Sequence, residues 1–240
     1  MSAVGRGRGA LHVMRGYAIC TEPRSGSAFL CRLLASTGVL GQPTEYFNPP
    51  AVRVRFGIED YPTDPEAQLA AIPKLGATPN GVYGLKVFAS HFDLVKETRW
   101  AQRLPGLTVI HLQRNDLLGQ AISHVRAMQT QQWVSFQAAS GEPRYNVGLI
   151  NNEMVRLARA HARWRYYFAR NGIDVLNLVY EQIVQTPAET AAAVARLVGL
   201  PDTPTIDMEE VGRLRIQRDA LNDDWRRRFI AEARDVATFH

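Results

Sequence analysis

Four short apolar runs alternate with longer amphipathic segments along the chain. The runs cover residues 17–21, 82–87, 107–112 and 173–179. Each run is almost continuously apolar and rich in β-branched residues, which is typical of strands covered on both faces of a sheet. Because helical patterns lie between the runs, the sequence predicts an α/β fold with a central parallel sheet.

Amphipathic patterns predict helices over residues 25–37, 116–128 and 147–170. The first helix would end at Gly38, in the left-handed conformation that glycine adopts easily. Further along, Thr186-Pro187-Ala188-Glu189 has the composition of a helix start, with the threonine as its cap and the glutamate closing a capping box. Asn222 is the candidate cap of a last helix.

Two segments are less regular, residues 39–81 and residues 129–146, and both are rich in Pro, Gly, Gln and Asn. In an α/β domain such excursions usually carry the substrate site. The chain has no internal repeat and no low-complexity linker. We therefore predict a single domain over residues 15–240, preceded by a flexible N-terminal extension over residues 1–14.

The composition allows a sizeable core, since 46% of the 240 residues are hydrophobic. Cys20 and Cys31 have no metal-ligand spacing, so we expect two reduced, packed thiols in a cytoplasmic protein. No apolar run approaches the roughly 18 residues that a membrane span needs, and no transmembrane segment is predicted.

The formal net charge of +5 favours anionic ligands. Arginine greatly outnumbers lysine, and the planar guanidinium suits phosphate, sulfate and carboxylate. The arginine-rich stretches 163–165 and 226–228 lack the interleaved exposed aromatics of single-strand binding proteins. We expect them to be solvated helix faces, with no nucleic-acid partner.

The most informative stretch is Pro23-Arg24-Ser25-Gly26-Ser27, which joins the first predicted strand to the first predicted helix. A helix start offers free backbone N–H groups and a positive dipole end to an anion. The glycine lets an anion approach the backbone, the serines add hydroxyl donors, and Arg24 adds a cation that keeps its proton. The stretch therefore predicts an anion site that extends to the next residue, Ala28.

A nucleoside triphosphatase loop is a poor match to this stretch. That motif, G-x-x-x-x-G-K-[ST], needs a lysine directly after its second glycine, and Gly26 has none. No clear acidic metal ligand follows the later strands. A small-molecule kinase is therefore an alternative that the sequence disfavours, and no metal site is predicted.

A second candidate anion grip follows the third predicted strand. Arg114 comes at the end of that strand, and Ser123 lies two turns into the next helix. Ligands of open α/β sheets bind at the carboxyl edge of the strands. Two grips at neighbouring strand ends would suit a nucleotide with phosphates at both its 5′ and 3′ positions.

Together these motifs resemble the sulfotransferases that use 3′-phosphoadenosine 5′-phosphosulfate (PAPS), and most closely the bacterial enzymes that sulfate trehalose. The resemblance runs from Tyr17 to the C-terminal helix. It includes the segments "RSGS", "GQPTEYFNP", "YGLKVFASHF", "RNDLLGQAISHVRAMQTQQW" and "LNDDWRRRF", as well as Tyr180-Glu181 with the later Leu197-Val198-Gly199-Leu200.

The resemblance implies a three-layer α/β/α fold related to P-loop nucleotide kinases, and sulfuryl transfer to a sugar hydroxyl. It implies that Arg24 and the neighbouring hydroxyl residues hold the 5′-phosphosulfate. Arg114 and Ser123 would hold the 3′-phosphate, and Glu45 would be the general base. Arginines near the C-terminus often close over the nucleotide in such enzymes, and the candidates are Arg215 and Arg218.

Other residues are candidates because of their positions. Lys86 ends a predicted strand and would face the sulfuryl group. Tyr46 and Phe47 would offer stacking surfaces to a sugar, and Trp133 would line the sugar pocket. His91 is the alternative base, although the Lys-x-His segment that supplies the base in animal-type enzymes is not matched, because Lys86 and His91 lie five positions apart.

The acceptor implied by the resemblance is trehalose, at its 2-position, or a related sugar. A glycolipid head group or another alcohol is the first alternative, and a non-catalytic nucleotide-binding protein is the second. Relatives in the family are often homodimers, so a homodimer is the expected assembly.

Overall fold

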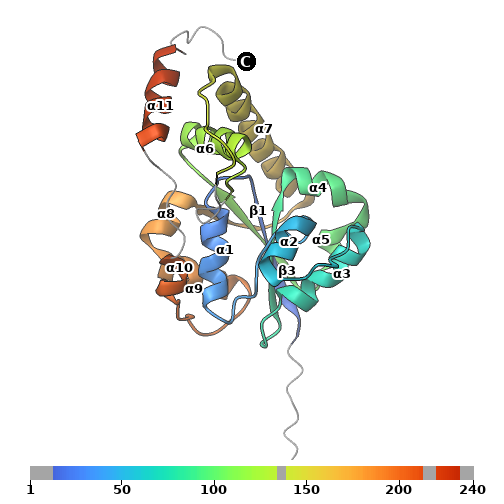
Figure 1. Cartoon of the computed structure of the whole chain (residues 1–240). Helices are drawn as coiled ribbons and strands as arrows, with labels where there is room; N and C mark the ends of the chain where they lie inside the picture. Colours follow the sequence, from blue (N-terminus) through green and yellow to red (C-terminus); the bar gives the residue numbers. More distant parts are fainter. Residues whose placement is uncertain (1–12, 134–138, 213–219, 233–240) are drawn as a thin grey trace, which may run out of the picture.

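A computed structural model describes residues 13–133, 139–212 and 220–232. A four-stranded, all-parallel sheet forms its centre, and helices flank the sheet (Figure 1). The strands are β1 (Arg15–Thr21), β2 (Val82–Phe88), β3 (Leu107–Gln113) and β4 (Val175–Val179). Their order in the sheet is β2-β1-β3-β4. All four predicted strands and the parallel α/β sheet are confirmed.

The helices connect these strands and cover them. They are α1 (Ser27–Ser36), α2 (Pro49–Phe56), α3 (Pro65–Gly76), α4 (Ala89–Val95), the short 3₁₀ turn η1 (Lys96–Thr98), α5 (Trp100–Arg103), α6 (Leu117–Thr130), α7 (Val147–Asn171), α8 (Tyr180–Gln185), α9 (Pro187–Leu197), α10 (Met208–Gly212) and α11 (Ala220–Glu232).

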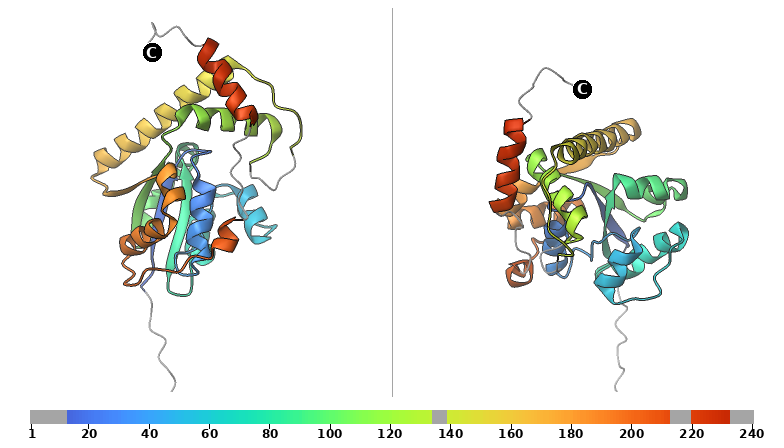
Figure 2. Two further views of the ribbon diagram at one scale, coloured as in Figure 1. Left: turned by 90° about the vertical axis from the view of Figure 1, so that its left-hand side faces the viewer. Right: turned by 45° about the horizontal axis from the view of Figure 1, so that its top comes forward.

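Alternate residues of β1 enter two different cores. Tyr17 and Ile19 pack with α1 and α9 on one face of the sheet. Ala18 and Cys20 pack on the other face with residues of α2, α3, α5 and α7. Successive side chains of a strand point to opposite faces, so a strand buried on both sides has to be apolar throughout. The result is the predicted three-layer arrangement, which Figure 2 shows from two further directions.

A third, smaller core joins α6, α7 and α11. Trp225 and Phe229 of α11 are buried against Ile122 and Val125 of α6. Figure 1 shows these three helices together at the end of the molecule toward which the strands run. This core fixes α6, which carries Ser123, over the carboxyl edge of the sheet.

Several local predictions need correction. The irregular segment 39–81 contains α2 and α3, both of which start at proline. The capping box at residues 186–189 does not form, because the Thr186 hydroxyl donates to the carbonyl of Gln182 in the preceding turn. Asn222 lies inside α11 instead of capping it, and accepts a hydrogen bond from Arg126. Residues 1–12 of the predicted extension lie outside the described residues.

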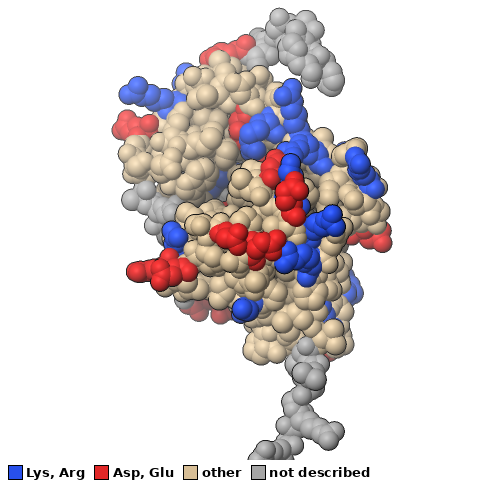
Figure 3. All heavy atoms as spheres, turned by 90° about the vertical axis from the view of Figure 1, so that its right-hand side faces the viewer, with Lys and Arg blue, Asp and Glu red and all other residues tan. Residues whose placement is uncertain are grey.

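The face drawn in Figure 3 carries basic and acidic side chains close together. Among the described residues, Arg163 pairs with Asp93 and Arg103 pairs with Glu66. Positive charge in that part of the surface is thus interleaved with negative charge.

Candidate active site

The carboxyl ends of β1 and β3 lie side by side, because these strands pair directly with Cys20 opposite His111. The neighbour of β1 on its other side is β2. The connection from β1 to β2 and the connection from β3 to β4 therefore leave in opposite directions, and open α/β sheets bind ligands at such a point between two strands. Residues 22–26, here called the anion loop, follow β1, and Arg114 follows β3. The two predicted grips meet at one edge of the sheet.

Gly26 allows the anion loop to turn into α1. Its φ is +84°, and a Cβ atom built on it would lie 2.0 Å from Cδ2 of Tyr180. No other residue type fits there without moving that ring. The residue at the N-cap of α1 is Gly26, which has no side chain to cap the helix, so the backbone N–H groups of the first turn are candidate donors to an anion.

Arg24 brings together the residues predicted to hold the nucleotide. Its Nε donates to the Ser123 hydroxyl over 2.8 Å, and its NH1 group donates to the Trp133 carbonyl over 2.6 Å. In turn, the backbone carbonyl of Arg24 accepts a hydrogen bond of 3.2 Å from Arg114. Residues from the anion loop, from the end of β3 and from α6 thus form one cluster.

The cluster is strongly positive and partly desolvated. Burial, followed by the charges of Arg114 and Arg126, lowers the pKa of Arg24 to about 10, which leaves it charged at neutral pH. An anion would relieve this repulsion. Sequence reasoning missed Arg126, although it lies three residues after Ser123, on the same face of α6.

Arg114 is oriented by the segment that follows β4. Its guanidinium lies 5.2 Å from the ring centroid of Tyr180, and its Nε lies 4.0 Å from Oε1 of Glu181. The Glu181 carboxylate also accepts the backbone N–H groups of Asn115 and Asp116. Nε of Arg114 is buried and makes no hydrogen bond to the described residues. A buried donor of this kind is costly, and a bound phosphate oxygen would satisfy it.

The hydroxyl residues of the anion loop are less open than predicted. Ser25 is fully buried, and its hydroxyl shares a hydrogen bond of 2.7 Å with Thr21. Ser27 is also buried, whereas Ala28 is exposed at the start of α1. Ser25 therefore shapes the loop as well as being a candidate donor.

Glu45, the predicted base, and Lys86, the predicted contact of the sulfuryl group, form an ion pair. Nζ of Lys86 lies 2.7 Å from Oε1 of Glu45, and the side chains are only 11% and 17% exposed. The amide of Asn48 donates to the second oxygen of Glu45 over 2.7 Å. Lys86 lies on β2, directly beside β1, with Ile19 as its partner in the register.

The pair keeps both groups charged. Burial by itself raises the pKa of Glu45, but Lys86 and Asn48 lower it, and the net result is a pKa below the usual value. Burial lowers the pKa of Lys86, but the charge and hydrogen bond of Glu45 together with Cys31 raise it, and the net shift is upward although the nearby charge of Arg24 opposes it. The effect of Arg24 on Lys86 links the ion pair to the arginine cluster.

Tyr46 and Phe47 lie in the core, which corrects the expectation that they present open stacking surfaces. Tyr46 is fully buried, stacks on Phe56 and donates to the carbonyl of Gln42. Phe47 is 5% exposed and packs edge-on against Trp100. Their burial anchors the segment that carries Glu45.

His91 and Trp133 have different surroundings. His91 lies on α4 beside Phe88, and its buried Nδ1 makes no hydrogen bond to the described residues. Burial, only partly opposed by Glu45, lowers the pKa of His91. Trp133 is 40% exposed, and its ring lies 5.7 Å from that of His124. Trp133 thus lies beside the arginine cluster, with its carbonyl bound by Arg24.

Arg215 and Arg218 lie outside the described residues. Within the described ranges, no group of three or more His, Cys, Asp or Glu side chains could hold a metal ion. In the same ranges, none of the helices combines the length and the apolar character needed to cross a bilayer. Cys20 and Cys31 are buried and unpaired, as predicted.

This edge of the sheet has the features of a group-transfer site for an anionic donor. The sequence profile of the Stf0 sulphotransferase family matches residues 16–232, and the chain belongs to this family. It is a sulfotransferase.

Two curated relatives are similar over nearly their whole length. A trehalose 2-sulfotransferase of Mycobacterium tuberculosis is 28% identical, with 92% of this chain and 96% of that protein aligned. A trehalose 2-sulfotransferase of Mycolicibacterium smegmatis is 27% identical, with 90% and 95% aligned. Among solved structures, the sulfotransferase domain of the olefin synthase of Synechococcus PCC 7002 matches with a TM-score of 0.46 and 16% identity, over 91% of this chain and 90% of that chain.

Proposed function

We propose that the protein transfers a sulfuryl group from PAPS to a carbohydrate hydroxyl. The observation that carries this proposal is the contact of Arg24 with both Ser123 and Arg114, at the paired ends of β1 and β3. One nucleotide with phosphates at its 5′ and 3′ positions would bridge this cluster. The start of α1 and Arg24 would hold the 5′ side, and Arg114 and Ser123 the 3′ side.

We propose trehalose or a related disaccharide as the acceptor. The support is the similarity to two trehalose 2-sulfotransferases over at least 90% of this chain. The exposed ring of Trp133 beside the arginine cluster would give a sugar a surface to stack on. A glycolipid with the same sugar as its head group would make the same polar contacts.

The chain's own groups would act by position and charge. The donor supplies the sulfuryl group and a phosphate that leaves in line with the attacking hydroxyl. Arg24 and the dipole of α1 would stabilise the charge that develops on the leaving phosphate. Lys86 would contact the sulfuryl oxygens, and Glu45 would accept the proton of the sugar hydroxyl. A base in this role contributes roughly 10²–10⁴-fold to the rate.

The ion pair between Glu45 and Lys86 sets a condition on this mechanism. The lowered pKa of Glu45 keeps it ionised, but also makes it a weaker base. A sulfuryl group bound at Lys86 would compete for the ammonium and so raise the basicity of Glu45. Base strength would then depend on the presence of the donor.

Replacement of Glu45 by glutamine tests the proposed base. E45Q should retain binding of 3′-phosphoadenosine 5′-phosphate while the rate of transfer of labelled sulfate to trehalose falls at least 100-fold. E66Q is the matched control, because Glu66 is an exposed carboxylate that pairs with Arg103 at the surface. If E45Q transfers sulfate at the wild-type rate, Glu45 is not the base.

Ligand titration separates the proposal from its alternatives. Calorimetry should show saturable binding of 3′-phosphoadenosine 5′-phosphate and none of ATP with magnesium, which a kinase would bind. A non-catalytic nucleotide-binding protein would bind the first ligand but would add no mass to any sugar in a panel assayed with PAPS. The homodimer and the cytoplasmic location stay predictions from the sequence.

A further inference from the structure

Each of the three residues before Arg24 accepts a hydrogen bond from another element of the fold. The carbonyl of Thr21 accepts a hydrogen bond from the indole of Trp164, and the carbonyl of Pro23 accepts one from Gln120. The carboxylate of Glu22 accepts the backbone N–H of Ala89 over 3.1 Å. These contacts come from α7, α6 and the start of α4, so three separate elements hold one short segment.

Arg24 needs such support because its backbone has a φ of +62°. A residue with a Cβ atom is strained in this left-handed region, and it stays there only when its surroundings hold it. Without that support, the backbone of Arg24 would relax toward negative φ. The guanidinium would then leave its place between Ser123 and Trp133.

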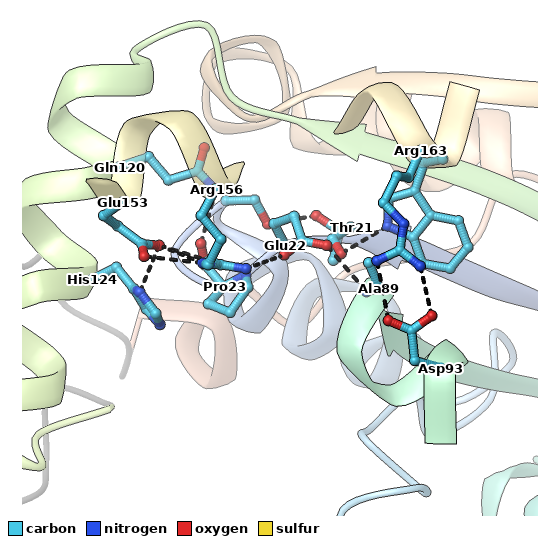
Figure 4. A network of polar contacts seen from close by, with 12 residues as sticks. Thr21, Glu22, Pro23, Ala89, Asp93, Gln120, His124, Glu153, Arg156 and Arg163 are labelled. Atoms are coloured by element: carbon cyan, nitrogen blue, oxygen red, sulfur yellow. Dashed lines mark hydrogen bonds and ion pairs between the residues drawn. The ribbon is translucent and has the colours of Figure 1, made fainter. Parts of the chain in front are cut away.

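A network of polar side chains supplies part of the support (Figure 4). NH1 of Arg156 lies 3.0 Å from Oε2 of Glu22. The same guanidinium donates from Nε and NH2 to Glu153, one turn earlier on α7, over 2.8–3.2 Å. Oε1 of Glu153 lies 2.7 Å from Nδ1 of His124, which is the neighbour of Ser123 on α6. This network of side chains thus begins at Glu22, two residues before Arg24, and ends at His124, one residue after Ser123.

Arg156 is the cation that pairs with both carboxylates of this network. Glu22 is 1% exposed and Glu153 is 5% exposed, so both carboxylates would be costly to leave without a cation. Burial raises the pKa of Glu22, and the hydrogen bond and charge of Arg156 counteract that rise. Arg156 itself is 43% exposed, so a shorter neutral side chain can be accommodated at its position without overpacking.

We propose that Arg156 is a positioning residue that holds the anion loop and α6 in register for donor binding. The inference rests on the proposed function, since it concerns the same pair of grips. Within the described part of the chain, the ion pairs of Arg156 are with Glu22 and Glu153 and not with Arg24, Arg114 or Ser123. It acts through Glu22 on the backbone of Arg24, and through Glu153 and His124 on the helix that carries Ser123.

Two measurements on R156Q test this inference. The first is hydrogen–deuterium exchange without ligand, in which the amides of residues 22–28 should exchange faster than in the wild type. The second is affinity for 3′-phosphoadenosine 5′-phosphate, which should fall roughly tenfold because a small misplacement of a binding group is expensive. The KM for the sugar should stay within twofold of the wild-type value.

R163Q is the matched control. Arg163 lies two turns further along α7 and forms an ion pair with Asp93 of α4, whereas Arg156 is the arginine of α7 that pairs with Glu22 of the anion loop (Figure 4). R163Q should change neither the exchange of residues 22–28 nor the nucleotide affinity. R156K keeps the charge but loses the planar fork that reaches both carboxylates, so its affinity should lie between those of R156Q and the wild type.

The outcomes separate this inference from the proposed function. If the loop amides of R156Q exchange as slowly as those of the wild type, Arg156 does not position the loop and the inference is wrong. If they exchange faster but the nucleotide affinity is unchanged, Arg156 supports the fold alone, which also overturns it. If the wild type does not bind the nucleotide, the proposed function fails, and the exchange data still decide whether Arg156 holds the loop. Should R156Q fail to fold, the same criteria apply to R156K.

Discussion

Replacement of Lys86 by methionine should destabilise the protein strongly at neutral pH and much less in acid. The Lys86 and Glu45 side chains are 11% and 17% exposed, with Nζ and Oε1 2.7 Å apart. Methionine fills a similar volume, so the main loss is the charge that compensates Glu45. Removal of one partner from a largely buried pair costs about 3–5 kcal/mol. For a chain of this length, that loss lowers Tm by roughly 6–20 °C.

The pH dependence follows from the directions of the two pKa shifts. The pKa of Glu45 is lowered in the folded protein, so its contribution to stability is present above its unfolded pKa and is lost as the pH falls through the folded one. The pKa of Lys86 is raised, so its contribution is complete below its unfolded pKa and is lost as the pH rises through the folded one. In K86M, the lysine no longer counteracts burial, so the pKa of Glu45 would rise. Glu45 would then take up a proton at a higher pH than in the wild type, and the neutral carboxyl would no longer destabilise the fold.

Urea unfolding at pH 7 and pH 4.5 measures this effect. The stability deficit of K86M should be largest at pH 7 and should shrink as the pH falls. The double variant K86M/E45Q should recover most of the lost stability, because it leaves no buried charge unpaired. K74M serves as the control, since Lys74 is an exposed residue of α3 and its loss should stay within about 0.5 kcal/mol. Equal deficits for K86M at both pH values would refute the reasoning.

Two further variants test other parts of the site. G26A should abolish measurable nucleotide binding in calorimetry, because its Cβ would lie 2.0 Å from the Tyr180 ring at a φ of +84°; an affinity within threefold of wild type would contradict the assigned role of the turn. W133A should raise the KM for trehalose roughly tenfold while nucleotide affinity changes less than twofold, because Arg24 binds the carbonyl and not the ring of Trp133. The reverse pattern in steady-state kinetics would place the ring at the nucleotide.

Local patterns were enough to predict the sheet and the junction between β1 and α1. The four apolar runs identified the strands, because a strand covered on both faces has to be apolar at every position. Arg24 and Gly26 at a strand-to-helix junction indicated an anion site, because a helix start exposes N–H groups, and that site stays a prediction. Both signals act between residues close in sequence.

Other predictions were wrong where residues distant in sequence determine the local structure and the burial of a side chain. Segment 39–81 carries α2 and α3, whose buried residues Val52 and Ile72 reach a core that is completed by β1 and α7. From the sequence, Tyr46 and Phe47 were predicted to be exposed aromatic side chains, but both are buried in the same core. Asn222 looked like a helix cap, yet Arg126 lies close enough to bind its side chain.

The sequence by itself determined which residues carry charge and where strands and turns form. Only the tertiary structure decided which charges meet. Glu45 and Lys86 lie 41 positions apart in the sequence, and Glu22 and Arg156 lie 134 apart, yet both pairs are in contact. Such pairs depend on the strand order β2-β1-β3-β4 and on how α7 packs over it. Burial then sets the strength of these contacts, since a charge inside the protein needs a partner that a solvated charge does not.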